Sequence, residues 1–253
     1  MVNCGCNLWG HTVLGLPAGL RPRFLAGLAE SELEAVLSQA KHRRYIRSSV
    51  ILHQGDPAER LLLLTSGRGR HFVLTGAGRK ILLHWLTAGQ VCGGAALVPP
   101  PCNYLASTEV LSDSCALAWD RSAMRELVTH IPKLLDNALS IAAFEHVAWL
   151  IGAVVSLSSE DAQSRIADFL ISLACGIGKN GPDGVEIPVA NEELAAAANV
   201  TPFTVSRFLS KWQRDGILTK GRGKILLRRP ELLVGPGNSL KTPSIPVSLP
   251  ALR

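Results

Sequence analysis

The chain has 253 residues, a hydrophobic fraction of 47%, and a formal net charge of +6 from 26 Lys and Arg against 20 Asp and Glu. This length suffices for one or two domains with a sizeable core, and the apolar content excludes a chain that is disordered throughout. A positive excess of this size permits a polyanionic partner without locating one. The position of the charges along the chain therefore matters more than their sum.

The N-terminal residues and the cysteines favour a cytoplasmic protein. The opening MVNCGCNLWG lacks the basic segment and apolar run of a secretion signal, and the six cysteines follow no regular disulfide spacing. The best candidate for a membrane span, residues 138–157, carries Glu145 and His146 near its middle. Because an ionisable group at a bilayer centre costs about 2.5–3.5 kcal/mol, we expect a buried helix there and no membrane partner.

The first 130 residues divide into a short extension and a β-rich domain. Residues 1–20 are glycine-rich without periodicity, and we assign them to an N-terminal extension. Within residues 21–130, a helical period extends over residues 21–47, where Ser31 and Glu34 have the spacing of a capping box. Short apolar runs, separated by Gly and Pro turn signals, then predict an antiparallel barrel or sandwich. These runs are Val50–Leu52, Leu61–Leu64, His71–Leu74, Ile81–Leu86 and Cys115–Trp119.

A long helix is predicted over residues 131–157. Leu135, Ala142 and Trp149 recur in it at seven-residue spacing. The residues between them on the same stripe are Ala138, Ile141, Glu145 and Gly152. Such a stripe of small and large residues favours a helix that pairs with a second copy of itself. Packing against other parts of the same chain is the alternative.

Residues 158–233 form a second predicted unit, and residues 234–253 a flexible Pro-rich tail. A helix is expected from Glu160 to about Ala174. A polar glycine loop follows it and leads into a short strand, Val185–Val189. The remainder of the unit contains the strongest functional signal in the chain.

Residues 191–229 have the pattern of a winged helix-turn-helix. Asn191 is the expected N-cap of a short alanine-rich helix, which a turn of a few residues follows. Thr201 caps a second helix with Pro202 at its first position, where proline's missing N–H costs little. A hairpin with the basic tip Lys220-Gly221-Arg222-Gly223-Lys224 completes the pattern. In this motif the second helix enters the major groove of DNA.

The basic charge of the chain is concentrated in residues 201–229. This segment contains eight Lys and Arg residues against Asp215 alone, a net charge of +7, whereas the whole chain carries +6. Such a local surplus favours contact with DNA phosphates, and a solvated basic helix pair is the alternative. The residues expected to contact DNA are Thr201, Phe203, Thr204, Ser206, Arg207, Ser210, Lys211, Lys220, Arg222 and Lys224.

The order of these elements resembles the CRP/FNR family of bacterial transcription regulators over residues 30–232. Thr204-Val205-Ser206-Arg207 and Gln213–Leu218 resemble the family's recognition helix and its exit turn. The recurring turns of the family's β-roll are matched by Gly55-Asp56, Ser66-Gly67, Gly78-Arg79, Gly89-Gln90 and Tyr104-Leu105-Ala106.

The resemblance implies an α+β fold with three parts. They are an N-terminal cyclic-nucleotide-binding-like β-roll, or jelly-roll, a long dimerisation helix, and a C-terminal winged helix-turn-helix. It also implies a homodimer in the bacterial cytoplasm that binds double-stranded DNA and contacts RNA polymerase.

One departure from the family concerns cyclic AMP. Relatives that bind it resemble one another in a Gly-Glu turn and a following Arg, which hold the ribose and the cyclic phosphate. Here the stretch Cys92–Leu97 has no Glu, and Tyr104 stands where the Arg is expected. Without a guanidinium partner the phosphate loses its charge-assisted hydrogen bonds, so we do not expect cyclic AMP to bind. The effector is unknown, and the residues expected to line its pocket are Gly93, Gly94, Ala95, Tyr104 and Ala106.

A second departure lies in the recognition helix. The family often has a Glu three positions before the Ser of the pair Ser206-Arg207, and this chain has Phe203. A carboxylate accepts from a cytosine amino group, whereas a phenyl ring either contacts a thymine methyl or packs. Arg207 is the candidate for a bidentate contact to guanine. We therefore expect half-sites that differ from the family's usual ones, about one helical turn apart.

Four cysteines are candidate ligands of a metal centre: Cys4, Cys6, Cys102 and Cys115. Oxygen-sensing relatives resemble this outline, with N-terminal cysteines and a distant one that hold an iron–sulfur cluster, which typically needs four thiolates. A thiol switch is a second alternative. The third is that Cys92, Cys115 and Cys175 are small buried core residues. No histidine has a partner at a spacing diagnostic of haem.

The motifs of common enzymes do not occur: there is no Gly-x-Ser-x-Gly, His-Glu-x-x-His or Walker phosphate loop. We therefore expect no enzyme. The leading hypothesis is a sequence-specific DNA-binding transcription regulator that responds to an unidentified signal. The rival is a redox- or metal-binding protein whose basic domain serves protein contacts or non-specific nucleic-acid binding.

Overall fold

The computed structural model describes residues 16–17, 19–76, 78, 80–147, 150–151, 154 and 161–233. The chain divides into two compact units, Met1–His146 and Val147–Arg253. None of the helices in the described ranges combines the length and the apolar character that crossing a membrane requires.

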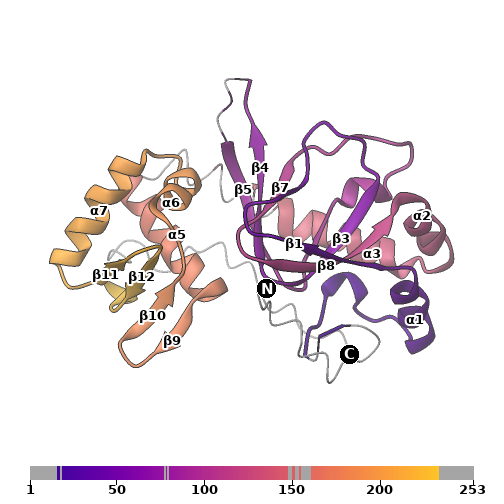
Figure 1. The fold of residues 1–253 in the computed structure, drawn as a ribbon, viewed down its shortest axis with the longest axis horizontal. Coiled ribbons are helices and arrows are strands. Elements are labelled where there is room, and N and C mark those ends of the chain that lie inside the picture. Colours follow the sequence, from indigo (N-terminus) through magenta and orange to yellow (C-terminus); the bar gives the residue numbers. More distant parts are fainter. Residues whose placement is uncertain are drawn as a thin grey trace. The chain divides into compact units, whose positions relative to one another are not determined.

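The first unit contains two four-stranded antiparallel sheets, with strand orders β1-β8-β3-β6 and β2-β7-β4-β5 (Figure 1). The strands of the first sheet are β1 (Lys41–Tyr45), β8 (Ser114–Asp120), β3 (Arg60–Ser66) and β6 (Val91–Cys92). Those of the second sheet are β2 (Val50–Leu52), β7 (Ser107–Val110), β4 (Arg68–Leu74) and β5 (Lys80–Thr87). Every apolar run predicted to be a strand lies in one of them, so the β-rich prediction is confirmed.

Two strands of this unit lack the apolar alternation that identifies a strand. The predicted helical period through residue 47 is wrong beyond α1 (Glu30–Ser38), because Lys41–Tyr45 forms the edge strand β1. Charged side chains are common on such a strand, since they discourage pairing with another chain. In β7, Thr108 and Glu109 are polar but buried. Their partners come from strands distant in sequence, which no local pattern reveals.

Strand β3 separates two hydrophobic cores. Leu61 and Leu63 belong to a core that β3 shares with the helices, and Leu62 and Leu64 to the core that it shares with the second sheet. All four side chains are at most 1% exposed. A continuous apolar run of this kind is typical of a strand that is covered on both faces.

The helices cover the outer face of the first sheet. They are η2 (Arg23–Leu25), α1, α2 (Arg121–His130) and α3 (Lys133–Ser140), and η3 (Gly94–Leu97) is a further short helix of this unit. The indole N–H of Trp119 in β8 donates to the carbonyl of Val36 in the last turn of α1 at 2.7 Å. The amide of Asn137 in α3 donates to the carbonyls of Phe24 and Ala26. These bonds fix the helices to the sheet and to each other.

The predicted capping box is wrong by two residues. Helix α1 is preceded by Ala29, whose N–H donates to the Glu32 carboxylate at 2.8 Å. Ser31 lies inside the helix instead. The spacing of a capping box recurs along acidic sequences, so the pattern alone does not fix which pair is used.

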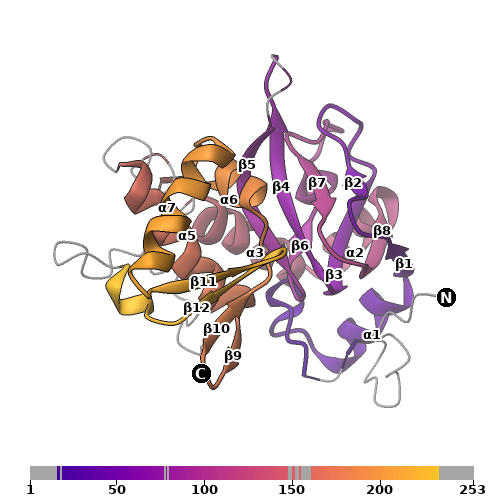
Figure 2. The same cartoon turned by 60° about the vertical axis from the view of Figure 1, so that its left-hand side comes forward.

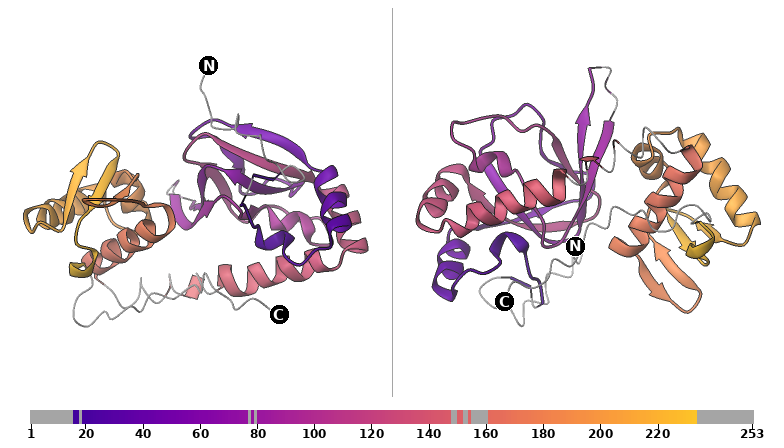
Figure 3. Two further views of the ribbon diagram at one scale, coloured as in Figure 1. Left: turned by 90° about the horizontal axis from the view of Figure 1, so that it is seen from below. Right: turned by 180° about the vertical axis from the view of Figure 1, so that it is seen from behind.

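The helix after α2 continues from α3 into one π-helical segment, η4 (Ile141–His146). In both views of Figure 3 this helix, drawn in pink, runs alongside the β-rich unit. Ile141 and Ala138 pack into the core of their own chain, whereas Leu135 and Ala142 are exposed. The predicted stripe thus mixes an inner and an exposed face, since Leu135 and Ala138 already differ in burial within α3. Trp149 and Gly152 lie outside the described residues.

The second unit is a small α/β domain with a four-stranded sheet of order β11-β12-β10-β9 (Figure 2). Its helices are α5 (Ala162–Ile177), α6 (Asn191–Ala197), α7 (Pro202–Arg214) and η5 (Pro230–Leu232). Its strands are β9 (Lys179–Gly181), β10 (Gly184–Ile187), β11 (Leu218–Gly221) and β12 (Lys224–Leu227). The sequence does not predict β9, whose residues are polar and exposed.

Two helix starts of this unit differ from the prediction. Asp161 caps α5 by accepting from the Ser164 N–H at 2.8 Å. Asn191 is not the cap of α6 but its first residue, because the N–H of Ala190 donates to the Glu193 carboxylate at 2.9 Å. A glutamate that bonds back to the start of a helix replaces the capping side chain at both α1 and α6.

Candidate DNA-binding surface

Helices α6 and α7 are joined by a tight turn. Asn199 adopts a left-handed backbone with φ of 50°, which asparagine tolerates better than most residues. The N–H of Val200 donates to the carbonyl of Ala195 at 3.0 Å, and the guanidinium of Arg165 in α5 donates to the carbonyl of Ala198 at 2.9 Å. Both alanines are buried, so the two helices approach closely. The turn therefore fixes the direction in which α7 leaves α6.

The start and inner face of α7 are those predicted from the sequence. The hydroxyl of Thr201 accepts from the N–H of Thr204 at 3.1 Å, with Pro202 at the first helical position. Val205, Leu209 and Trp212 are buried, each at most 3% exposed. Burial of this face leaves the opposite face of α7 on the surface.

Two predicted base-contacting residues lie on the open part of α7. Phe203 is 78% exposed, so its ring does not pack within the unit. Arg207 is also exposed, and its guanidinium lies 5.1 Å from the ring centroid of Phe208. A cation–π contact of this kind restricts the orientation of the guanidinium. Because residues four apart share a helix face, Phe203 and Arg207 point to the same side.

The hairpin of β11 and β12 is tied to α7. The ammonium group of Lys220 donates to the hydroxyl of Ser210 at 2.9 Å, and the Lys220 N–H donates to the Gln213 side chain at 3.2 Å. Ser210 in turn donates to the carbonyl of Ser206 at 2.8 Å. Helix and hairpin therefore form one continuous polar surface, with Arg222 exposed at the hairpin tip.

Two further predicted lysines are also engaged with their own chain. Lys211 donates to the Gln163 side chain at 3.2 Å, and Lys224 forms a 2.7 Å ion pair with Glu186. Exposed contacts of this kind contribute at most about 1 kcal/mol, so a phosphate oxygen can replace them. The sequence does not predict these supporting contacts of Gln163, Gln213 and Glu186, because neutral amides and isolated acids give no charge signal.

The expected effector residues form a packed segment in the first unit. The Tyr104 hydroxyl donates to the carbonyl of Arg60 at 2.8 Å and accepts from its N–H at 2.9 Å. Burial raises the pKa of Tyr104, which keeps the phenol a donor. Gly93 has φ of 81°, and a Cβ there would lie 2.4 Å from the same Arg60 carbonyl. Gly93 and Tyr104 thus meet at the backbone of Arg60.

The other three expected effector residues lie nearby in sequence and differ in burial. Ala95 packs against the core between the two sheets, and its carbonyl accepts from the Cys102 thiol at 3.5 Å. Ala106 is half-buried, and Gly94 is exposed. The side chains of this segment are thus apolar or bonded to their own chain.

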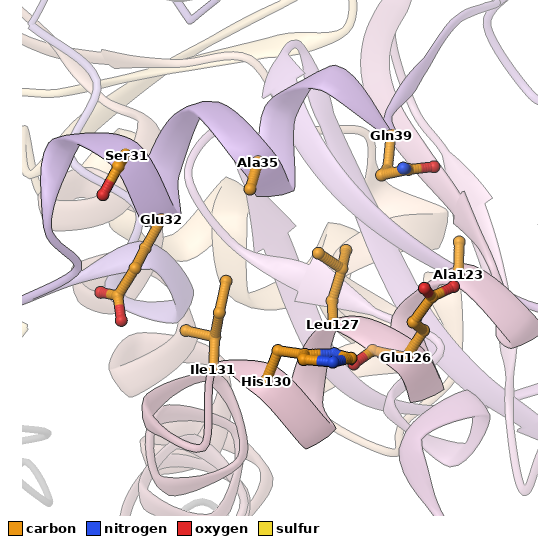
Figure 4. A pocket seen from close by; sticks show the side chains of 9 residues that line it. All are labelled: Ser31, Glu32, Ala35, Gln39, Ala123, Glu126, Leu127, His130 and Ile131. Atoms are coloured by element: carbon orange, nitrogen blue, oxygen red, sulfur yellow. The ribbon is translucent and has the colours of Figure 1, made fainter.

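A shallow pocket of about 320 Å³ lies between α1 and α2 (Figure 4). Glu32 of α1 and Glu126 and His130 of α2 are the titratable residues that line it. The lining contains no Lys or Arg. A pocket with two carboxylates and no guanidinium or ammonium group is poorly suited to a cyclic phosphate.

The cysteines divide between core and surface. Cys92 and Cys115 are buried, as the core alternative expects, whereas Cys102 and Cys175 are exposed. Burial raises the pKa of Cys92 to about 12, so its thiol stays protonated. Within the described ranges, no three His, Cys, Asp or Glu side chains are arranged to hold a metal ion. Cys4 and Cys6 lie outside those ranges, so the cluster and thiol-switch hypotheses remain predictions.

Two domain families match the chain. Residues 42–130 match the cyclic nucleotide-binding domain, and residues 164–234 match the Crp-like helix-turn-helix domain. The cyclic AMP receptor protein of Thermus thermophilus is 29% identical over 207 residues, which cover 82% of this chain and 93% of that protein. Electron transport regulator A of Shewanella oneidensis is 24% identical over 192 residues, which cover 75% of this chain and 76% of that protein.

Solved structures of related regulators have the same fold. The c-di-GMP responsive global regulator CLP of Xanthomonas campestris aligns with a TM-score of 0.71 at 20% identity, covering 79% of this chain and 99% of that one. FixK2 of Bradyrhizobium japonicum aligns with a TM-score of 0.67 at 21% identity, covering 77% of this chain and 95% of that one. With its β-rich domain followed by a DNA-binding helix-turn-helix, the chain belongs to the CRP/FNR family of transcription regulators.

Proposed function

We propose that this regulator binds DNA sequence-specifically as a homodimer, with Phe203 and Arg207 reading base edges in the major groove. The main support for this proposal is the solvent-exposed face of α7. On this face Phe203 is 78% exposed, and Arg207 beside it is also exposed. Both side chains lie on one face of a segment with a net charge of +7, which favours a polyanionic partner. A DNA base edge offers partners to both side chains.

The spacing of the two residues fits base pairs up to two steps apart. Four residues of α-helix advance about 6 Å, and adjacent base pairs are about 3.4 Å apart. Arg207 matches the acceptors O6 and N7 of guanine, and Phe203 matches the methyl group of thymine. Lys220 and Arg222 on the hairpin are positioned as phosphate contacts, which add affinity without sequence preference.

The dimer is supported by the apolar surface of the helix after α2. Leu139 and Phe144 are 67% and 66% exposed, although both are large apolar residues. Further along the chain, Ile151 and Val154 are helical and 60% and 62% exposed. Exposed apolar residues that recur along a helix favour pairing with a second helix. A second copy of the chain supplies the same surface.

We propose that the signal to which this regulator responds is not a cyclic nucleotide. Tyr104, which stands where relatives that bind cyclic AMP have an arginine, uses its hydroxyl to bond the backbone of Arg60. A buried phenol with both bonds satisfied offers no positive charge to a phosphate. The domain type of residues 42–130 is therefore retained, while the chemistry for a cyclic phosphate is missing.

Arg207→Ala should weaken binding to the preferred DNA site by about 5- to 150-fold, because a bidentate contact to guanine is worth about 1–3 kcal/mol. Affinity for random DNA should change little. The site is first obtained by selection from a random library, and affinities are then measured by fluorescence anisotropy over a salt series. The matched control, Arg222→Ala, should weaken both DNAs equally and lower the salt slope by about 1. An equal loss on both DNAs for Arg207→Ala would contradict base reading.

Phe203 is tested by removing the methyl group from the DNA instead of from the protein. Replacing the contacted thymine with uracil should weaken wild-type binding about fourfold, since burial of one methyl group is worth about 0.8 kcal/mol. Phe203→Ala should bind both DNAs equally. If the variant still discriminated thymine from uracil, another residue would be reading the methyl group.

Leu139→Glu should raise the dissociation constant of the dimer at least about tenfold, because it places a charge in an apolar interface. The monomer–dimer equilibrium is measured by sedimentation, with circular dichroism to verify the fold. Thr129→Glu adds the same charge to an exposed position of α2 and serves as the control. Dissociation constants that do not differ between the two variants would place the dimer interface elsewhere.

Cyclic AMP at millimolar concentration should leave the Tm of the protein unchanged. A ligand present at 100 times its Kd stabilises a protein by about 2.7 kcal/mol, which shifts Tm by several degrees. Differential scanning fluorimetry provides the measurement, with the cyclic AMP receptor protein of Thermus thermophilus as the positive control. A comparable upward shift in both proteins would refute the proposed role of Tyr104.

A further inference from the structure

Three histidine rings meet between the second sheet and the helical segment that follows α3. His71 in β4 lies directly opposite His84 in β5, and their ring centroids are 4.7 Å apart. The ring of His146, the last residue of η4, lies 5.2 Å from that of His84. We call these three residues the histidine cluster. It brings together parts of the chain that are more than sixty residues apart in sequence.

The histidine cluster is connected to the core of the first unit. The hydroxyl of Thr108 in β7 lies 2.9 Å from Nδ1 of His71. The same threonine side chain is hydrogen-bonded to the Cys92 thiol. Thr108 is 1% exposed and Cys92 4% exposed. A polar chain thus leads from the interior of the sandwich to the surface of η4.

The two histidines on the sheet are neutral near pH 7. Burial, and to a smaller extent the neighbouring His146, lower the pKa of His84 to about 4. Burial also lowers the pKa of His71 well below its ordinary value, with added contributions from His84 and His146. The backbone hydrogen bonds made with Ser107 and Trp85 oppose these shifts only in part.

Glu109, the acidic residue of the second sheet, is already paired with two basic side chains. Glu109 in β7 accepts from Arg70 at 2.9 Å and from Lys80 at 3.1 Å. Burial raises the pKa of Glu109, but these bonds outweigh burial and lower it overall. Arg70 precedes His71 on β4 and therefore points to the opposite face of the sheet. On η4 the neighbouring titratable residue in sequence is Glu145, whose side chain lies outside the described ones.

Segment η4 has few buried residues to hold it. Ile141 is buried at 8% exposure, whereas Phe144 is 66% exposed. Ala142 and Ala143 are also exposed, and His146 is half-buried. The segment is π-helical, a rare form that within α-helices is frequently found at functional sites. The contact of His146 with His84 is therefore a substantial part of its attachment.

We propose that the histidine cluster is a proton-sensitive contact: neutral rings hold η4 against β4 and β5, and their protonation in acid releases it. Positive charges on rings about 5 Å apart repel each other, and the burial that lowers the pKa of His71 and His84 leaves this repulsion weakly screened. Because η4 directly precedes the second unit along the chain, its release changes DNA affinity. This last step rests on the proposed function, whereas the contact itself does not.

The direction of the pH effect follows from the lowered pKa values. A released histidine regains a pKa of about 6.5, so the released state binds more protons than the packed state as the pH falls below that value. The stability that the neutral rings give to the packed arrangement is present above pH 6.5 and is lost toward pH 4. For His84 alone, the shift to a pKa of about 4 favours release by about tenfold at pH 5.5 and approaches about 300-fold well below pH 4.

Hydrogen–deuterium exchange of the full-length protein tests the contact. After correction for intrinsic rates, the amide protection of Ile141–His146 should fall about tenfold or more between pH 7.5 and 5.5, both with and without a chelator. His84→Gln should abolish most of this pH dependence. His53→Gln, which replaces an exposed histidine outside the cluster, should retain it. If His84→Gln does not fold, a wild-type NMR titration of the imidazole rings decides, with two rings expected to titrate well below pH 6.5.

Three results would overturn the proposal. One is protection of η4 that stays constant from pH 7.5 to 5.5, and another is an equal loss in His84→Gln. The third is a pH response that disappears when the chelator is present, since a bound metal ion would then be responsible. A released η4 with unchanged affinity for the selected DNA would refute its regulatory role. Absence of specific DNA binding at every pH would instead count against the proposed function.

Discussion

The first unit depends on the complete burial of Leu61–Leu64 in β3. Its four consecutive leucines alternate between the helices on one side and the second sheet on the other. Everything that carries function in this unit is attached to one of these two sides. The helices η2, α1 and α2 position α3 and thereby the exposed apolar side chains of α3 and η4. The second sheet positions His71 and His84. A polar residue in the middle of β3 would disturb both at once.

In the second unit, too, the burial of one element determines the position of the functional residues. Val205, Leu209 and Trp212 are buried on one side of α7, and this burial decides which residues remain for DNA. Phe203 lies on the opposite, exposed face of α7, where its phenyl ring is in contact with solvent. Because Lys220 is bonded to Ser210, the hairpin and the helix keep a fixed relation within the unit. A rigid polar surface loses little conformational entropy when it meets DNA.

The sequence predicts those parts of the fold whose signals are local. Thr201 and Pro202 fix the start of α7, and the leucine run identifies β3, because capping and burial act over a few residues. Strands β1 and β7 are not predicted, since an edge strand is charged and Glu109 finds its partners Arg70 and Lys80 on other strands. The exposed face of α7, which we propose as the DNA-binding surface, is therefore largely predictable from the sequence, whereas the side-chain amides that support it are not.

The histidine cluster could not be predicted for the same reason. Positions 71, 84 and 146 follow no spacing, and only the pairing of β4 with β5 and the course of η4 unite them. The segment around Tyr104 and the histidine cluster lie in the same unit. Tyr104 bonds the backbone of Arg60 in the segment where a phosphate ligand is expected, and we propose that this removes one route for a signal. The buried polar group that remains in contact with the helix is a set of titratable rings. A fold that keeps its architecture but loses a ligand's charge partner needs another two-state contact if it is to stay responsive, and neutral imidazoles packed against a weakly attached helical turn provide one.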